Sequence, residues 1–172
     1  MEILFINKCV LSTSPSLESD YTLVVIYGNT ANLAYFRPGF KTWITIDSCR
    51  HHYFDVIYYQ EQFYAIDFRG RITAIDIKSD DTVVAKKVAN LPKKLDGANK
   101  LYLVESAGKL LVVARHVVFV EDEFNSLRLV AYGTDAFHVL EVDLSSNKWS
   151  QVKNLGNRSL FLGENSSFSV EV

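Results

Sequence analysis

The side chains best suited to metal binding lie together in one short stretch, Cys49-Arg50-His51-His52. A thiolate and two imidazoles are ligands that zinc accepts, but a tetrahedral site needs ligands that can surround the ion. Three ligands within four residues give poor geometry, and no distant pair completes the set convincingly. We therefore expect an exposed loop here, with no metal and no other cofactor.

Three aspartates, Asp67, Asp76 and Asp143, offer carboxylates for acid–base chemistry. Each closes an apolar strand pattern, as in Ile-Asp-Ile at 75–77 and Val-Asp-Leu at 142–144. Because this position repeats, we expect these carboxylates to accept hydrogen bonds from turn amides. Their predicted role is structural.

His116 and His138 are separated by a polar insertion and lie next to apolar strand residues. We expect both at strand ends, where backbone groups satisfy the rings. No Gly-x-Ser-x-Gly motif precedes a helix, so nucleophilic hydrolysis has no local support. The sequence therefore predicts no enzyme, and we assign no catalytic, cofactor-binding or metal-binding residue. Partner-binding residues stay unassigned at this level.

Trp43 and Trp149 could each serve as a stacking platform for a sugar or a base. They occupy corresponding positions in two repeats, which favours packing between neighbouring sheets instead. Gly28, Gly39 and Gly70 stand singly, without the spacing of a phosphate-binding loop. We expect the glycines in turns and the tryptophans in the core.

Composition is that of a globular chain without a strong charge bias. Of the 172 residues 48% are hydrophobic and 22% are charged, and the net charge is −2. A nucleic-acid binder needs a basic face, so this class is not expected. The basic pairs Lys86-Lys87 and Lys93-Lys94 are interpreted as solvated blade edges, because Asp80, Asp81 and Asp96 flank them.

The elements that position these residues repeat along the chain. Apolar strands open at Val10, Val56 and Leu101, and the steps between them are 46 and 45 residues. The next step, to Leu160, is 59 residues and contains a polar insertion. A period of about 40–50 residues built from short strands is typical of β-propeller blades. The chain has too few units to close a ring.

The predicted fold is all-β: a partial kelch-like β-propeller with about three and a half four-stranded antiparallel blades. One domain, 1–172, holds blades at about 8–47, 54–92 and 101–152, and a fourth begins at 158–172. In the second blade both faces of the strand Arg71–Ile77 carry apolar residues, as expected for a sheet between two neighbours. The first blade is predicted to end with the strand Thr42–Ile46, which holds Trp43.

The insertion, about His116 to Asp135, includes the acidic triplet Glu121-Asp122-Glu123, which we interpret as solvated. We expect a lengthened hairpin whose strands reach past the sheet. Insertions in repeat proteins cluster on the face that binds partners. The insertion is therefore the predicted recognition element, together with the loops that connect the blades.

Several strings resemble the plant F-box proteins that carry the KIB-type β-propeller domain. They are Leu33-Ala34-Tyr35-Phe36-Arg37-Pro38-Gly39 followed by Trp43, Asp55-Val56-Ile57-Tyr58-Tyr59, Phe63-Tyr64-Ala65-Ile66-Asp67 before Arg69-Gly70-Arg71, Tyr102-Leu103-Val104-Glu105-Ser106 with Gly108, and Leu160-Phe161-Leu162-Gly163 followed by Asn165-Ser166-Ser167-Phe168-Ser169-Val170. The last is the most specific. The resemblance covers essentially the whole chain.

The resemblance implies a function that the residues alone do not. In this family an amino-terminal F-box docks an adaptor of a cullin-based ubiquitin ligase, and the propeller recognises the protein to be ubiquitylated. No leucine-rich helical segment precedes the first unit, so we expect a truncated member that lacks the F-box. An adaptor contact is therefore not expected from these residues, and the matched motifs carry over no active-site residue.

The expected function is a non-enzymatic protein-interaction module with an unidentified protein partner and no nucleic-acid or membrane partner. The start Met1-Glu2-Ile3-Leu4 lacks the basic residues and long apolar run of a secretory signal, so cytoplasm or nucleus is expected. Two alternatives stay open. One is a truncated family remnant without a biochemical role, and the other is a carbohydrate-binding or enzymatic kelch-like propeller.

Overall fold

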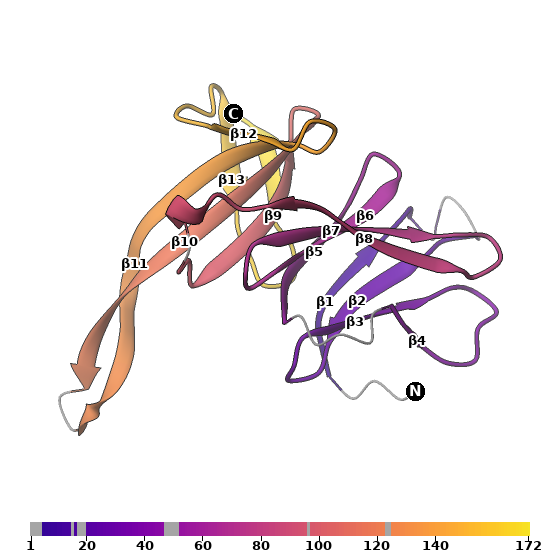
Figure 1. Ribbon diagram of the computed structural model, residues 1–172, viewed down its shortest axis with the longest axis horizontal. Helices are drawn as coiled ribbons and strands as arrows, with labels where there is room; N and C mark the ends of the chain where they lie inside the picture. The colour runs from indigo at the N-terminus through magenta and orange to yellow at the C-terminus, as the bar shows by residue number, and fades with distance from the viewer. Residues whose placement is uncertain (1–4, 15, 17–19, 47–51, 96, 123–124) are drawn as a thin grey trace.

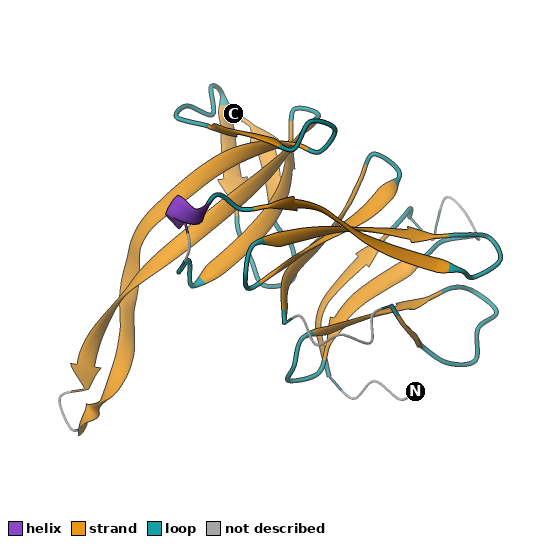
Figure 2. Cartoon of the chain, viewed as in Figure 1, coloured by secondary structure: helices purple, strands orange, loops and turns teal. Residues whose placement is uncertain are grey.

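A computed structural model describes residues 5–14, 16, 20–46, 52–95, 97–122 and 125–172, with backbone alone for 121, 122 and 125–132. In these residues the chain forms three four-stranded antiparallel sheets and one two-stranded sheet (Figure 1). Figure 2 shows strands throughout, with one short helical turn, η1 (Lys93–Leu95). The all-β prediction is confirmed, and the sheets form an open arc.

Each sheet follows the chain order as a meander. The first sheet holds β1 (Ile6–Leu11), β2 (Leu23–Tyr27), β3 (Asn32–Phe36) and β4 (Ile44–Thr45). The second holds β5 (Tyr53–Tyr59), β6 (Gln62–Asp67), β7 (Arg71–Ile77) and β8 (Val83–Asn90). The third holds β9 (Lys100–Ser106), β10 (Lys109–Asp122), β11 (Asn125–Asp143) and β12 (Lys148–Gln151). The fourth pairs β13 (Arg158–Phe161) with β14 (Phe168–Glu171).

Tight turns join the strands because a few residues adopt positive φ. Gln60 and Glu61, at φ 46° and 61°, connect β5 to β6, and Ala107 and Gly108, at 52° and 76°, connect β9 to β10. Two consecutive positive φ values give the turn whose twist matches a hairpin. Between β6 and β7, Gly70 has φ 72°, as its predicted turn position requires.

The first strands of the three four-stranded sheets stand side by side, and the fourth sheet follows through its second strand. β5 lies next to β1 on one side and next to β9 on the other, and β14 contacts β9. Three hydrophobic clusters fill the spaces between successive sheets. This arrangement, in which each sheet packs on its neighbour, is that of propeller blades.

Strand β7 shows why the second sheet needs neighbours on both faces. Ile72 and Ala74 belong to the cluster between the second and third sheets, whereas Ile75 belongs to the cluster between the first and second. Side chains alternate across a strand, so apolar residues at successive positions bury both faces. The sequence prediction of a sheet packed on both sides is confirmed.

The two tryptophans differ in position. Trp149 lies in β12 and packs against the core cluster between the second and third sheets, as expected. Trp43 precedes β4, which contains two residues, and its ring contacts Phe36 with centroids 5.5 Å apart. The predicted strand Thr42–Ile46 is thus too long. Phe40 and Ile46, instead of Trp43, pack against the cluster between the first and second sheets.

Candidate protein-interaction surface

The hairpin formed by β10 and β11 extends well beyond the third sheet (Figure 1). The two strands pair from Leu111 with Glu141 out to Asp122 with Asn125. Pairing of β10 with β9 stops at Arg115, and pairing of β11 with β12 stops at Leu140. Beyond these points both hairpin edges lie without a neighbouring strand in the described residues. The lengthened hairpin predicted from the irregular repeat is confirmed.

Asn99 marks the point where β10 leaves the sheet. The backbone amide of Asn99 donates to the Arg115 carbonyl at 2.9 Å. The backbone amide of Val117 donates to the side-chain Oδ1 of Asn99 at 2.9 Å. Across the hairpin, Arg115 Nε donates to Thr134 Oγ1 at 2.9 Å. These bonds fix the root of the hairpin, so its direction is set by the sheet below it.

The register beyond the root is irregular. It shifts between His116 and Val117, between Val118 and Phe119, and between Glu121 and Asp122. Such bulges bend a hairpin and increase its twist. They also make the edge a poorer template for uncontrolled strand pairing than a flat ladder is.

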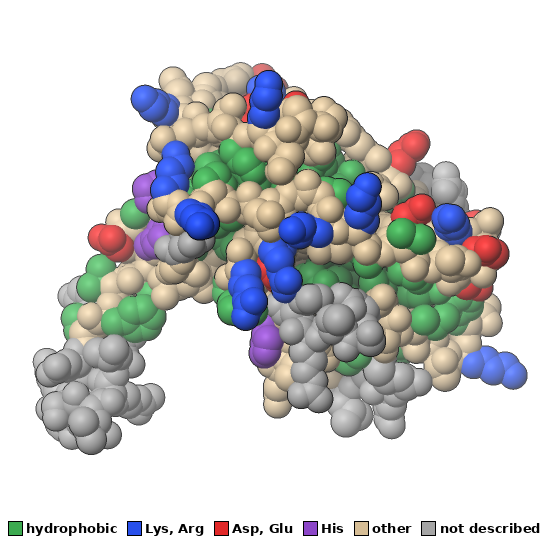
Figure 3. Space-filling model, in the orientation of Figure 1, with side chains coloured by type: hydrophobic (Ala, Val, Ile, Leu, Met, Phe, Trp, Pro, Cys, Tyr) green, Lys and Arg blue, Asp and Glu red, His purple; other side chains and the backbone are tan. Residues whose placement is uncertain are grey.

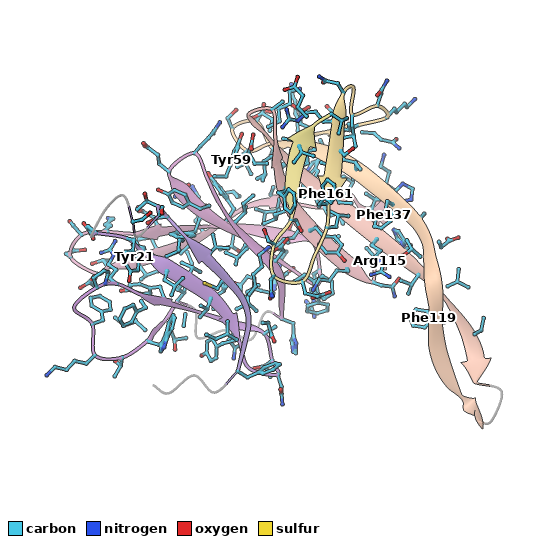
Figure 4. The ribbon with its side chains drawn as sticks, turned by 180° about the vertical axis from the view of Figure 1, so that it is seen from behind. Tyr21, Tyr59, Arg115, Phe119, Phe137 and Phe161 are labelled. Carbon is cyan, nitrogen blue, oxygen red and sulfur yellow. The ribbon has the colours of Figure 1, made fainter. Side chains whose placement is uncertain are left out.

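Large apolar side chains are exposed on this hairpin. The exposed fractions are 42% for Val118, 47% for Phe119, 41% for Val120 and 51% for Phe137. Phe119 lies far out along the hairpin, whereas Phe137 and Arg115 lie closer to its root (Figure 4). Apolar residues that project from a fixed support are the usual anchors of a protein interface.

His116 and His138 do not lie at strand ends, which corrects the sequence prediction. They lie within β10 and β11 at the root of the hairpin, with ring centroids 5.4 Å apart and edge-to-face packing. Nε2 of His116 is buried, and among the described residues no group hydrogen-bonds to it. The long pairing of β10 with β11 places these rings mid-strand, where the ladder already uses the backbone groups.

The predicted structural aspartates are confirmed in two cases of three. Oδ1 of Asp67 accepts from the amides of Arg69 and Arg71, each at 2.9 Å. Asp143 accepts from the amides and hydroxyls of Ser145 and Ser146. These hydrogen bonds hold the pKa of Asp143 well below its usual range.

Asp76 is the exception. It lies exposed within β7, one residue before the strand ends. In the turn between β7 and β8, Oδ1 of Asp80 accepts from the backbone amide of Thr82 at 3.0 Å. Hydrogen bonds from Thr82 lower the pKa of Asp80. The turn begins later than the sequence pattern indicated, so a different aspartate takes the role.

A buried ion pair joins the first two sheets where β1 and β5 stand side by side. Lys8 Nζ contacts Asp55 Oδ1, and the two residues are 6% and 2% exposed. Oδ1 also accepts from the Val56 amide, and Oδ2 accepts from the Leu103 amide of β9 at 2.8 Å. Asp55 thereby contacts all three four-stranded sheets. Burial raises the pKa of Asp55, while Lys8 and the two amides act in the opposite direction.

Sequence reasoning missed this group. The one available signal was a carboxylate inside the otherwise apolar and aromatic run 53–59, because a charge in a buried strand requires a partner. Close to Asp55, two of the segments that resemble the KIB-type family lie side by side. Val56, Ile57 and Tyr58 line a cavity of about 310 Å³ together with Asn165, Ser166 and Ser167.

The stretch Cys49-Arg50-His51-His52 lies outside the described residues except for His52. The His52 ring packs edge-to-face on Phe68 at 5.9 Å. Within the described ranges, no group of three His, Cys, Asp or Glu side chains could hold a metal ion. Within the same ranges, no helix has the length and apolar character of a membrane span.

Comparison with known proteins agrees with this geometry. The family model for the KIB1-4 beta-propeller matches residues 1–172. The F-box protein SKIP23 of Arabidopsis thaliana is 27% identical over 180 residues, covering 98% of this chain and 42% of that protein. The Arabidopsis thaliana F-box protein At2g17036 is 27% identical over 163 residues, covering 89% of this chain and 38% of that protein.

A further Arabidopsis thaliana protein, At5g55150, is 29% identical over 160 residues, covering 92% of this chain and 41% of that protein. The chain thus spans about two fifths of the length of these relatives. No solved structure matches. Since the family model covers every residue and the described sheets stack as blades do, the chain belongs to the KIB1-4 β-propeller family.

Proposed function

We propose that this chain is a non-enzymatic module that recognises a protein for ubiquitylation by a cullin-based ligase, in the cytoplasm or nucleus. Family membership and the F-box names of its relatives support a protein-interaction role. The ligase role goes beyond that support, because the chain matches only part of each relative's length.

The observation that carries the proposal is the projecting β10–β11 hairpin. Its edges lack neighbouring strands in the part of the chain that is described, and Val118, Phe119 and Phe137 expose much of their apolar surface. Exposed apolar side chains on a fixed support can anchor a partner, and the stretches of strand between the bulges can offer it backbone hydrogen bonds. We propose that the partner docks against this hairpin.

The proposal is tested by affinity capture of the tagged chain from plant tissue, with quantitative mass spectrometry. Three forms are compared: wild type, Val118→Ser/Phe119→Ser, and the control Val84→Ser. Val84 is 44% exposed and lies on β8, outside the hairpin. The control therefore removes a comparable exposed apolar group elsewhere.

Wild type and the Val84→Ser control should recover the same protein partners. Ligase adaptor subunits should be recovered with them through an associated F-box, since these residues predict no direct adaptor contact. The hairpin variant should lose partner recovery by about fivefold or more, as expected when interface anchors are removed. Adaptor recovery should not change. Absence of adaptor subunits from the wild-type capture would contradict the ligase role, and equal partner recovery by the hairpin variant would contradict the hairpin's role.

A further inference from the structure

An apolar cavity of about 490 Å³ opens between the second and third sheets. Its walls come from the start of β5, the β6–β7 turn and the connection from β8 to β9. The lining residues are Phe54, Phe68, Arg69, Gly70, Leu91, Leu95, Gly97, Ala98 and Leu101. This volume is within the range of sites that bind small ligands or single large side chains.

Close backbone contacts hold the cavity wall in shape. The Leu91 amide donates to the Gly70 carbonyl at 2.8 Å, and the Leu95 amide donates to the Pro92 carbonyl at 3.0 Å. A Cβ on Gly70 would lie 2.4 Å from the Leu91 Cβ, so the turn and the connection are in tight contact. The cavity is therefore preformed, which reduces the entropic cost of filling it.

One cationic side chain lines this apolar cavity, and two others lie on the helical turn just before its lining residue Leu95. Arg69 lines the cavity, and its guanidinium lies 5.2 Å from the Phe68 ring centroid. Lys93 and Lys94 are exposed on η1, directly before the lining residue Leu95. Figure 3 shows Lys and Arg side chains over β8, η1 and the turn before β7, with few acidic side chains among them.

Within the described residues, no acidic side chain neutralises these three cations, and no ion pair involves Arg69, Lys93 or Lys94. Asp81, expected to screen the basic pairs, is 3.1 Å from Arg37 at the opposite end of β8. Asp96 lies outside the described residues. A fourth cation, Lys100, differs from these three because it forms an ion pair. Its Nζ lies 2.7 Å from Glu164 and 5.5 Å from the Phe54 ring centroid.

We propose that this cavity binds an acidic polypeptide segment, with one large apolar side chain on the floor and carboxylates beside Arg69, Lys93 and Lys94. Charge complementarity selects the occupant, because the chain as a whole has a net charge of −2 and the cations gather here. The leucine floor suits an apolar anchor. Three free cations are few compared with the 6–10 phosphate contacts typical of a nucleic-acid site. The proposal does not depend on the ligase role or on the hairpin.

The test measures fluorescence anisotropy of a labelled peptide, Glu-Glu-Ser-Trp-Ser-Glu-Glu, titrated with the whole chain. Two further peptides replace the tryptophan by alanine or all four glutamates by glutamine. A labelled single-stranded uridine oligonucleotide tests the nucleic-acid alternative. The protein variants are Ala98→Phe, which fills the cavity, Lys93→Glu/Lys94→Glu, which reverses the rim charge, and the matched control Lys86→Glu/Lys87→Glu. Lys86 and Lys87 are exposed on β8, at least four residues before the lining residue Leu91, whereas Lys93 and Lys94 directly precede Leu95.

The acidic tryptophan peptide should bind saturably, and both altered peptides should bind at least about fivefold more weakly. Ala98→Phe and Lys93→Glu/Lys94→Glu should each weaken binding by about fivefold or more, and the control by less than about twofold. If Ala98→Phe does not fold, the charge-reversal pair decides, because those side chains are exposed. Absence of saturable binding, equal binding of the alanine peptide, an equal effect of the control, or tighter binding of the oligonucleotide would overturn the proposal.

Discussion

Asp55 joins the three four-stranded sheets at one point. Its carboxylate pairs with Lys8 of β1 and accepts the Leu103 amide of β9, with 2% of the residue exposed. Removing one partner of a buried ion pair leaves an uncompensated charge, whereas the pair itself contributes little net stability. The carboxylate therefore matters chiefly because it fixes which strands lie side by side.

Asp55→Ala should lower the free energy of unfolding by about 3–5 kcal/mol, because it leaves the Lys8 charge and the Leu103 amide without their buried partner. Urea denaturation of wild type, Asp55→Ala, Lys8→Met and the double variant measures this. The two substitutions should couple by about 1–3 kcal/mol. Strict additivity would show that the two side chains do not interact in solution.

Asp143 should make stability depend on pH through its lowered pKa. A carboxylate with a depressed folded-state pKa contributes stability that is present above its unfolded value of about 3.9 and is lost as pH falls toward the folded value. Thermal melts between about pH 6 and pH 2 should therefore show a smaller loss for Asp143→Asn than for wild type. Parallel profiles would contradict the assigned hydrogen bonds.

At the scale of single residues, the sequence predicted only contacts between near neighbours in the chain. The turn roles of Asp67 and Asp143 follow from neighbours within four residues. The Lys8–Asp55 contact joins residues 47 positions apart, and the His116–His138 contact depends on the register of a long hairpin. No pattern within one strand encodes such a pairing.

Among the elements, the β6–β7 turn connects the second sheet with the wall of the apolar cavity. Gly70→Ala combines a positive φ of 72° with a Cβ 2.4 Å from that of Leu91, so we expect it to cost about 2–4 kcal/mol. Gly108→Ala is the matched control: φ is 76° and no atom lies within 4 Å of the added Cβ. It should cost only about 1–2 kcal/mol. Equal costs in urea denaturation would show that the close contact is absent.

The hairpin should be separable from the fold. Replacing residues 118–133 by Asn-Gly joins Val117 to Thr134, which are opposite each other in the ladder, through a turn suited to hairpins. The hydrogen bonds of Val117 and Thr134 at the hairpin root are kept. Stability should change by less than about 1 kcal/mol, because no other strand pairs with the removed segment. A loss of more than about 3 kcal/mol in urea denaturation would mean that the segment is part of the core.

The elements were the most predictable part of the structure. The bounds of β6 and β7 follow from alternation and turn residues, and the length of the hairpin follows from the excess in the repeat step. The prediction was wrong at β4, where Trp43 precedes the strand. Aromatic residues favour strands, but at Trp43 the side chain packs on Phe36 outside the ladder.

At the scale of the whole molecule, the open arc leaves an apolar pair exposed on the fourth sheet. Phe161 and Phe168 stack with centroids 5.1 Å apart, and they are 51% and 49% exposed. Within the described residues no further sheet covers this pair. Large exposed apolar surface favours association between molecules.

The chain should therefore self-associate as its concentration rises, and Phe161→Ser/Phe168→Ser should weaken the association by about tenfold or more, given the apolar area that two Phe side chains remove from water. Sedimentation velocity measures this, with Val84→Ser as the control. A monomeric wild type at all concentrations would contradict the prediction. So would an equal effect of the control variant.

The Leu103 amide provides the most direct test of the stacked sheets. It donates to Asp55 across the boundary between two sheets, so without stacking it would be an open edge amide of β9. Hydrogen exchange resolved to single amides should show Leu103 protected nearly as strongly as the global unfolding free energy permits, and far less protected in Asp55→Ala. Rapid exchange of Leu103 in the wild-type chain would contradict the packing of β9 against β5.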